Sequence, residues 1–167
     1  MDELQPFEDI YREHRERVYW FCLSRIRDPT TAEDIANDVF VSAFRVYEQV
    51  RPAPARVPVW LFTIAKNAAT DHWRKQIRWR RLFASMGPAD ISHTDAEHTV
   101  EVRARLRAVL DAMKMLKPRD RTLIALRVGA DLSYAEMAEV LGMTEHAATV
   151  ASLRALERLR LRLEPGE

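Results

Sequence analysis

The chain has 167 residues, of which 47% are hydrophobic and 31% are charged, a balance typical of a folded protein rather than a disordered one. It has no apolar run near the roughly 18–20 residues that span a bilayer, and its first residues are acidic where a signal peptide is basic. We therefore expect a cytoplasmic protein without membrane insertion. The net charge of +1 does not exclude a nucleic-acid partner, because the distribution of charge controls such binding.

Three amphipathic helices are predicted in the first half of the chain. Apolar residues recur at helical spacing over about 6–26, and Thr31 is a candidate N-cap for a second helix. A proline-rich loop at 51–58 separates that helix from a third over about 60–81. The single cysteine, Cys22, lies on the apolar stripe of the first helix, so we expect a buried structural thiol rather than a redox group.

The third predicted helix combines cations with aromatic residues. Between 66 and 81 the chain has six Lys or Arg and one acid. The aromatic residues around these cations are Trp60, Phe62, Trp73 and Trp79. Such a helix can hold single-stranded DNA, with phosphates on the cations and bases stacked on the rings; a solvated basic helix with its aromatics in the core is an equal alternative. Asn67 and Asp71 share one face, where both can hydrogen-bond base edges or remain ordinary surface residues.

Residues 84–99 predict an interdomain linker, because they show no periodicity and contain a Gly-Pro pair. The segment is acidic, since 83–102 holds four acids and no Lys or Arg. Helical spacing resumes at Val102, and a further helix is predicted to begin at Pro118 and to end at Gly129.

A helix-turn-helix pattern occupies 132–153. Ser133 and Glu136 predict a capping box, Gly142 suits a tight turn with positive φ, and Thr144 can cap the following helix. The pattern favours DNA binding, and an ordinary helical hairpin is the alternative.

The fold class expected from the whole sequence is all-α. We expect two small helical domains, 1–83 and 100–167, joined by a flexible acidic linker, with the helix-turn-helix in the second domain.

Three segments, in this order and spacing, resemble the extracytoplasmic-function sigma factors of bacteria. AEDIANDVFVSAF at 32–44 is similar to the polymerase-binding helix of that family. WLFTIAKNAATDHWRK at 60–75 is similar to its promoter-melting segment, and LSYAEMAEVLG at 132–142 to its helix-turn-helix. The resemblance implies a sigma factor that binds RNA polymerase core and directs promoter recognition, DNA melting and transcription initiation. It implies no enzymatic activity, cofactor, metal or small-molecule substrate, and an anti-sigma factor is a further candidate partner.

The resemblance also implies three sets of binding residues. The set expected to bind polymerase core is Asp34, Asn37, Asp38 and Phe40. The set expected to bind the minus-10 promoter element, together with the loop at 51–58, is Thr63, Ile64, Asn67, Asp71, Arg74, Lys75 and Arg78. The set expected to bind the minus-35 element is Ser133, Tyr134, His146, Thr149, Val150, Leu153 and Arg154.

The helix after Thr144 departs from the family pattern. Thr149 stands where the family usually has Lys, Ala151 where it has Arg, and Ser152 where it has a core leucine. Because cations at these positions supply phosphate and guanine contacts, we expect weak recognition of the minus-35 element.

Two other classes remain as alternatives. A helix-turn-helix repressor or activator would need neither the acidic helix at 32–44 nor the segment 67–71, and it would normally dimerise on a palindrome. The second alternative is a sigma-like decoy, that is, a structural or interaction protein, and the weakened recognition helix is the reason to consider it. No metal-ligand spacing among the five histidines, phosphate-binding loop or nucleophile motif points to an enzyme.

Overall fold

The computed structural model describes residues 5–83 and 100–164, and all the regular structure in these ranges is helical. The N-terminal domain contains α1 (Phe7–Ile26), α2 (Pro29–Val50), the short 3-10 turn η1 (Pro54–Arg56) and α3 (Val57–Leu82). The C-terminal domain contains α4 (Val100–Lys114), α5 (Pro118–Ile124), the π-helical turn η2 (Ala125–Gly129), α6 (Tyr134–Leu141) and α7 (Glu145–Leu163). The linker predicted at 84–99 lies outside the described residues. The all-α fold with two helical domains is confirmed.

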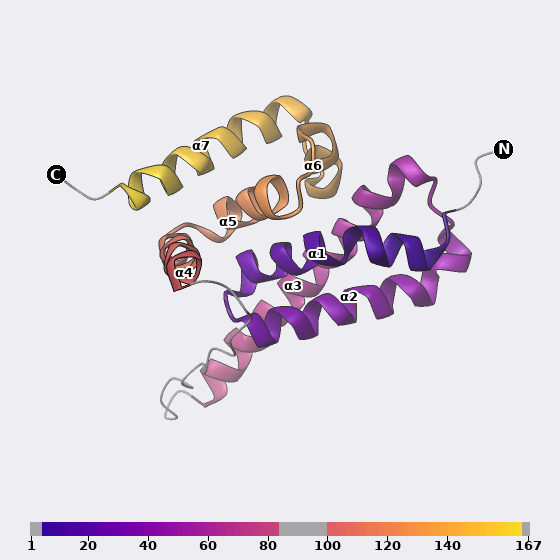
Figure 1. Ribbon diagram of the computed structural model, residues 1–167, viewed down its shortest axis with the longest axis horizontal. Coiled ribbons are helices and arrows are strands. Elements are labelled where there is room, and N and C mark those ends of the chain that lie inside the picture. Colours follow the sequence, from indigo (N-terminus) through magenta and orange to yellow (C-terminus); the bar gives the residue numbers. More distant parts are fainter. Residues whose placement is uncertain (1–4, 84–99, 165–167) are drawn as a thin grey trace.

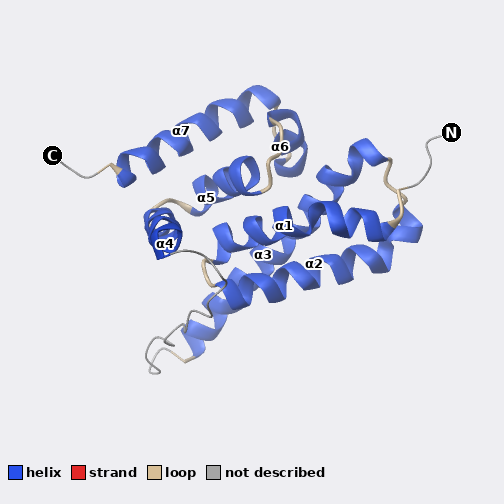
Figure 2. Ribbon diagram, viewed as in Figure 1, coloured by secondary structure: helices blue, strands red, loops and turns tan. Residues whose placement is uncertain are grey.

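The arrangement of the helices places both domains side by side. In Figure 1, α1–α3 form one bundle, and α4–α7 lie along one side of it, next to α1. Short loops join most successive helices within each domain (Figure 2). Buried apolar side chains from both domains form one continuous core, which includes Phe21, Phe62, Leu126 and Met137.

The start of α2 corrects one prediction. Asp28, not Thr31, is the N-cap, and its carboxylate accepts a hydrogen bond from the Thr31 backbone N–H at 2.9 Å. Pro29 occupies the first turn, where its missing N–H costs no hydrogen bond and its fixed φ already suits a helix. The Asp-Pro pair therefore starts the helix three residues before the position inferred for the cap.

The helix-turn-helix forms as predicted. The Ser133 backbone N–H donates to the Glu136 carboxylate at 2.8 Å, and the Glu136 N–H donates to the Ser133 hydroxyl at 3.2 Å. Gly142 has a φ of 65° in the turn, and the Thr144 hydroxyl accepts from the Ala147 N–H at 3.2 Å. These caps fix the ends of α6 and α7 within one rigid unit.

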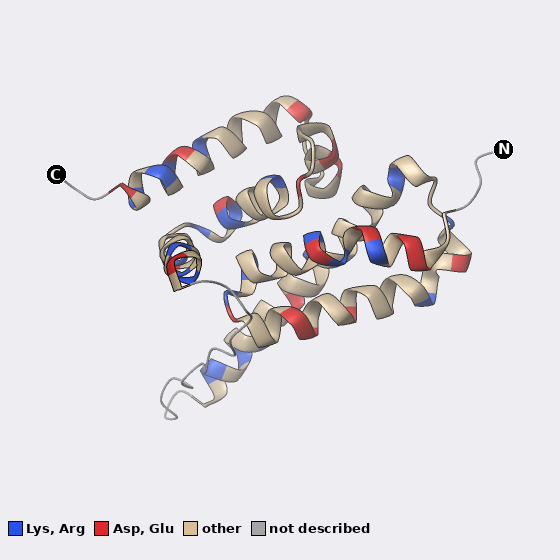
Figure 3. Cartoon of the chain, in the orientation of Figure 1, with Lys and Arg blue, Asp and Glu red and all other residues tan. Residues whose placement is uncertain are grey.

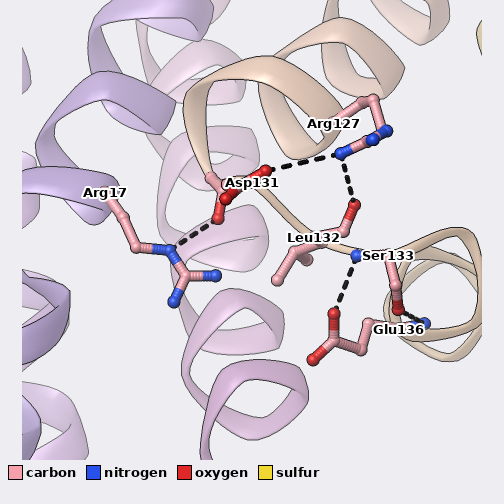
Figure 4. Close-up of polar contacts among 7 residues, drawn as sticks. Arg17, Arg127, Asp131, Leu132, Ser133 and Glu136 are labelled. Atoms are coloured by element: carbon pink, nitrogen blue, oxygen red, sulfur yellow. Dashed lines mark hydrogen bonds and ion pairs between the residues drawn. The ribbon is translucent and has the colours of Figure 1, made fainter.

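The two domains contact each other directly, and we call their contact surface the domain junction. A Cβ atom placed on Gly129 would lie 3.2 Å from the backbone carbonyl carbon and oxygen of Trp20. This separation is tighter than most Cβ contacts, so a residue without a side chain suits the close approach of η2 to α1. Arg17 of α1 crosses the junction, and its Nε donates to the Ala130 carbonyl oxygen at 2.7 Å, just before α6 (Figure 4). We call this packed state the closed arrangement.

Candidate nucleic-acid interface

The outward face of α2 combines carboxylates with apolar side chains. Asp34, Asn37 and Asp38 are exposed, as the sequence analysis expected. Phe40 is buried instead, and its ring packs edge-to-face on Tyr11 with centroids 4.9 Å apart. Phe40 therefore supports this face from within, and it also lines the groove between α1 and α2.

Two exposed apolar residues on α2 were missing from the expected site. Phe44 is 63% exposed and Val41 is 49% exposed, and both continue the helical stripe that begins at Asp34. A groove of about 510 Å³ lies between α1 and the first half of α2, and Asn37 is among the residues that line it. Acidic and apolar groups on one stripe are typical of a protein-binding surface rather than a plain solvated face. The signal in the sequence was Phe44 itself, an aromatic residue at an outward position.

The face of α3 expected to read the minus-10 element is largely accessible. Asn67 and Asp71 are exposed one turn apart, and the Arg74 guanidinium lies 3.8 Å from the Asp71 carboxylate. Lys75 and Arg78 are exposed further along the same helix. The cations gather where α3 extends beyond the bundle (Figure 3).

Thr63 and Ile64 are half-buried at the other end of that face. The Thr63 hydroxyl donates to the Val59 carbonyl oxygen at 2.7 Å, so its proton is already used within the helix. The Thr63 hydroxyl oxygen can still accept a hydrogen bond from a base.

The aromatic residues of α3 divide into two kinds. Phe62 is fully buried under the Arg17 guanidinium, 5.6 Å from the ring centroid, so the core interpretation holds for this residue. Trp79 is 62% exposed and stacks on Phe83 with centroids 4.9 Å apart and planes inclined by 16°. Trp73 is also exposed. The exposed rings lie among the arginines at the end of the helix, where stacking on a base is sterically open.

The C-terminal domain touches the face of α3 that was expected to read the minus-10 element. Arg56, in the turn before α3, forms an ion pair with Glu139 of α6 at 2.5 Å. The Lys66 ammonium donates to the Val140 carbonyl oxygen at 2.8 Å, and Lys66 lies one turn from Thr63. In the closed arrangement α6 therefore occupies space beside the loop and helix that were expected to hold an unstacked base.

The first turns of α7 present few charged groups. His146 and Arg154 are exposed, Leu153 is 55% exposed, and Thr149 and Val150 are half-buried. The Thr149 hydroxyl donates to the Glu145 carbonyl oxygen at 2.9 Å. Between Glu145 and Arg154 the helix has no Lys or Arg, so its capacity for phosphate contacts is small.

The remaining expected residues of this domain are at the start of α6, and Ser152 lies on α7. Ser152 is buried, as expected for the position where the family has a leucine. Ser133 is exposed and its oxygen serves the capping box, while the Tyr134 ring lies 5.3 Å below the Arg127 guanidinium.

Figure 4 shows how Arg127 stabilises this segment, since its guanidinium also reaches the carboxylate of Asp131 at 3.5 Å and the Leu132 carbonyl at 3.3 Å.

Across residues 5–83 and 100–164, no helix is long and apolar enough to cross a bilayer, and no group of His, Cys, Asp and Glu side chains is placed to hold a metal ion.

Comparison with known families identifies both domains. The family model for sigma-70 region 2 matches residues 10–80, and the model for sigma-70 region 4 matches residues 106–159. The order and position of the two matches define a sigma factor with a region 2 domain followed by a region 4 domain.

Individual relatives give the same result. RNA polymerase sigma factor CarQ of Myxococcus xanthus is 32% identical over 158 residues, which are 92% of this chain and 87% of that protein. ECF RNA polymerase sigma factor BldN of Streptomyces coelicolor is 30% identical over 166 residues, 99% of this chain and 62% of that protein. The chain belongs to the extracytoplasmic-function sigma factors of the sigma-70 family, and the resemblance found in its sequence is confirmed.

One solved structure supports the fold. The sigma factor RpoE of Bartonella quintana, in complex with the anti-sigma factor NepR, matches with a TM-score of 0.77 at 21% identity, over 96% of this chain and 98% of that one.

Proposed function

We propose that this sigma factor binds RNA polymerase core through the outward face of α2, with Asp34, Asn37 and Asp38 as its polar contacts. Phe44 and Val41 add apolar contact area beside these groups. Carboxylates steer the protein toward a basic partner surface, and burial of the apolar pair supplies the short-range affinity.

We further propose that α3 carries most of the promoter recognition. The observation that carries this proposal is the contrast between the two DNA-facing helices. On α3, Asn67 is exposed beside a run of arginines and open aromatic rings, whereas α7 has no cation between Glu145 and Arg154. Base-edge contacts and strand stacking at the minus-10 element would then exceed the minus-35 contacts in free energy.

The proposed division of the chain follows from these roles. Residues 1–83 would bind polymerase core and the minus-10 element, 84–99 would connect the domains, and 100–167 would add the weaker minus-35 contact. The protein would act in the cytoplasm as a binding factor without catalysis of its own. The Bartonella sigma factor was solved with an anti-sigma factor, which supports a similar partner here.

Promoter binding would require the closed arrangement to open. Arg56 and Lys66 cannot serve promoter DNA while Glu139 and Val140 of α6 hold them. We therefore assign the closed arrangement to the free protein, and the separated domains to the complex with polymerase.

Transcription by reconstituted polymerase tests the proposal. Core enzyme plus this protein should start transcripts from a defined set of genomic promoters on which core alone is silent. A protein that copurifies with core but starts no transcripts would be the sigma-like decoy, which the cation-poor α7 favours as the second candidate.

A further inference from the structure

Arg17 of α1 crosses the domain junction, and its guanidinium has three partners. Its Nε donates to the Ala130 carbonyl oxygen of the C-terminal domain at 2.7 Å (Figure 4). Its Nη1 lies 3.0 Å from Nδ1 of His14, one turn earlier on α1. The guanidinium carbon lies 5.6 Å from the centroid of the Phe62 ring of α3. The position of Arg17 between the domains therefore depends on His14 as well as on Ala130.

The contact between Arg17 and His14 fixes the proton on the imidazole ring. A guanidinium has N–H donors and no acceptor, so Nδ1 of His14 accepts this hydrogen bond and the neutral ring has its proton on Nε2. Protonation of the ring adds a hydrogen at Nδ1, the atom that accepts from Arg17. His14 is 1% exposed, so solvent has little access to the ring. The hydrogen bond from Arg17 and the charged form of His14 therefore exclude each other.

The charges that act on His14 come from both domains. Arg17 and Glu13 lie on α1, and Glu136 lies on α6. The Glu13 carboxylate is 3.8 Å from Nε2 of His14, but the Glu13 side chain is 59% exposed and screened by solvent. The Glu136 carboxylate already accepts from the Ser133 N–H at 2.8 Å. Burial and then Arg17 outweigh both carboxylates and lower the pKa of His14, so the closed arrangement favours the neutral ring.

We propose that protonation of His14 weakens the domain junction and shifts the free protein from the closed arrangement toward separated domains. A proton on Nδ1 removes the acceptor of Arg17 and places a second cation beside the guanidinium. Arg17 is then repelled from the position in which it donates to Ala130, and the junction loses a hydrogen bond between the domains. The apolar contacts within each domain do not titrate, so each domain should keep its helices.

Protonation is linked to promoter binding through the closed arrangement. This step rests on the proposed function, in which Arg56 and Lys66 serve DNA only after α6 has moved away. Closure is strongest above the ordinary histidine pKa of about 6.5 and weakens as pH falls from there toward the lowered pKa of His14. Because one group titrates, the ratio of separated to closed molecules should rise by at most about tenfold for each pH unit.

Small-angle X-ray scattering of the full chain between about pH 7.5 and 5.5 tests the proposal. Glu139, whose pKa the hydrogen bond from Arg56 lowers, stays ionised in this range, so its ion pair is constant. The radius of gyration of the wild type should increase as pH decreases, while helix content by circular dichroism stays constant. A radius independent of pH would overturn the proposal. Loss of helix content over the same pH range would also overturn it, because the expansion would then be unfolding.

Two histidine variants make the test specific. In His14→Gln the amide oxygen can accept from Arg17 and does not titrate, so this variant should stay closed throughout the pH range. His72→Gln is the matched control. Burial, and then the charge of Lys75, lower the pKa of His72 as well, but Lys75 and Asp28, the charges that act on it, both belong to the N-terminal domain. This control should expand as the wild type does. Expansion of His14→Gln, or a constant radius in His72→Gln, would assign the response to another group.

Arg17→Met repeats the test if His14→Gln does not fold by circular dichroism. Methionine can still contact the Phe62 ring but donates to neither His14 nor Ala130. This variant should therefore be more open at pH 7.5 than the wild type and should change less with acid. Equal closure and equal acid response would remove Arg17 from the account.

The scattering measurement needs neither polymerase nor promoter DNA. Its failure therefore leaves the sigma-factor proposal intact, and a failed transcription assay leaves the response of the junction to acid intact.

Discussion

Arg56, from the turn that precedes α3, forms a 2.5 Å ion pair with Glu139 of α6. The pair joins the loop expected to hold a minus-10 base to the helix-turn-helix domain. Both side chains are about half exposed, so solvent screens the attraction and the contact is easily exchanged for a polymerase or DNA contact. An exposed ion pair of this kind can hold the closed arrangement in the free protein and still break when the two domains separate.

Reversal of one charge in this pair should shift the protein toward separated domains. Glu139→Arg places two cations together, and the radius of gyration should increase at low salt and less so at high salt. The double variant Arg56→Glu with Glu139→Arg should return it toward the wild-type value, and an unchanged radius in both variants would exclude a role for the pair.

The same pair should make closure depend on pH. The hydrogen bond from Arg56 lowers the pKa of Glu139, so the pair stabilises closure above the ordinary pKa of Glu139. This stabilisation is lost as acid protonates the carboxylate.

Gly129 offers a second way to open the junction. Gly129→Ala puts a Cβ 3.2 Å from the Trp20 backbone, which cannot move aside as a flexible side chain would. We expect a larger radius of gyration with little loss of helix content by circular dichroism.

Gly142→Ala is the matched control for this glycine. Gly142 has a φ of 65° and no atom within 4 Å of an added Cβ. This variant should lose about 1–2 kcal/mol of stability from backbone strain alone, without opening the junction. Equal scattering curves for wild type and Gly129→Ala would contradict the assigned role of Gly129.

His14 should make the stability of the protein depend on pH. Its ring is buried, and Nδ1 accepts a hydrogen bond from Arg17 at 3.0 Å. Burial, and then the charge of Arg17, lower the pKa of His14 below 6.5, while Glu13 and Glu136 partly offset this. The unfolded chain then binds a proton that the folded chain does not, so the free energy of unfolding should fall as pH decreases below about 6.5.

The His14→Gln variant isolates this effect. Glutamine can still accept from Arg17, so folding should survive while the dependence of stability on pH between 7 and 5 becomes weaker. His146→Gln, at an exposed position on α7, should leave the slope unchanged. Urea unfolding at each pH measures both, and identical slopes for wild type and His14→Gln would contradict the assignment.

The outward face of α2 predicts how polymerase binding responds to charge. Reversal of Asp34 and Asp38 together should lower the affinity for core by about tenfold or more, because like charges would then meet at the interface. Phe44→Ala should lower it through lost apolar contact. Asp131→Lys, on a loop of the C-terminal domain, is the control. Pull-down at moderate salt measures the affinity, and full retention by the double charge reversal would remove α2 from the interface.

Local features of the fold were accessible from the sequence, and the long-range ones were not. The capping box at Ser133 and the turn at Gly142 depend on residues a few positions apart, so their pattern predicts them. Thr31 was wrong as a cap because the Asp28-Pro29 pair, equally local, was overlooked. The contact of Gly129 with Trp20 joins residues over a hundred positions apart, and no periodicity encodes such a pairing.

The candidate site divides in the same way. Helical spacing placed Asp34, Asn67 and Arg74 on exposed faces, and the structure has them there. Phe40 has the same spacing but is buried, because burial depends on α1 as well as on α2. The hydrogen bond from Lys66 to α6 could not be predicted from the sequence, because its acceptor is a backbone carbonyl of the other domain.

Open-complex formation on promoters mutated separately in each element is the most direct test of the central claim that α3 dominates promoter recognition. Minus-10 substitutions should reduce open complexes far more than minus-35 substitutions do. Asn67→Ala should relax preference at one minus-10 position, at a cost of about 1–3 kcal/mol. Ala151→Arg should raise the affinity for minus-35 DNA and steepen its salt dependence. Greater damage from minus-35 substitutions, or an unchanged base preference in Asn67→Ala, would contradict the account.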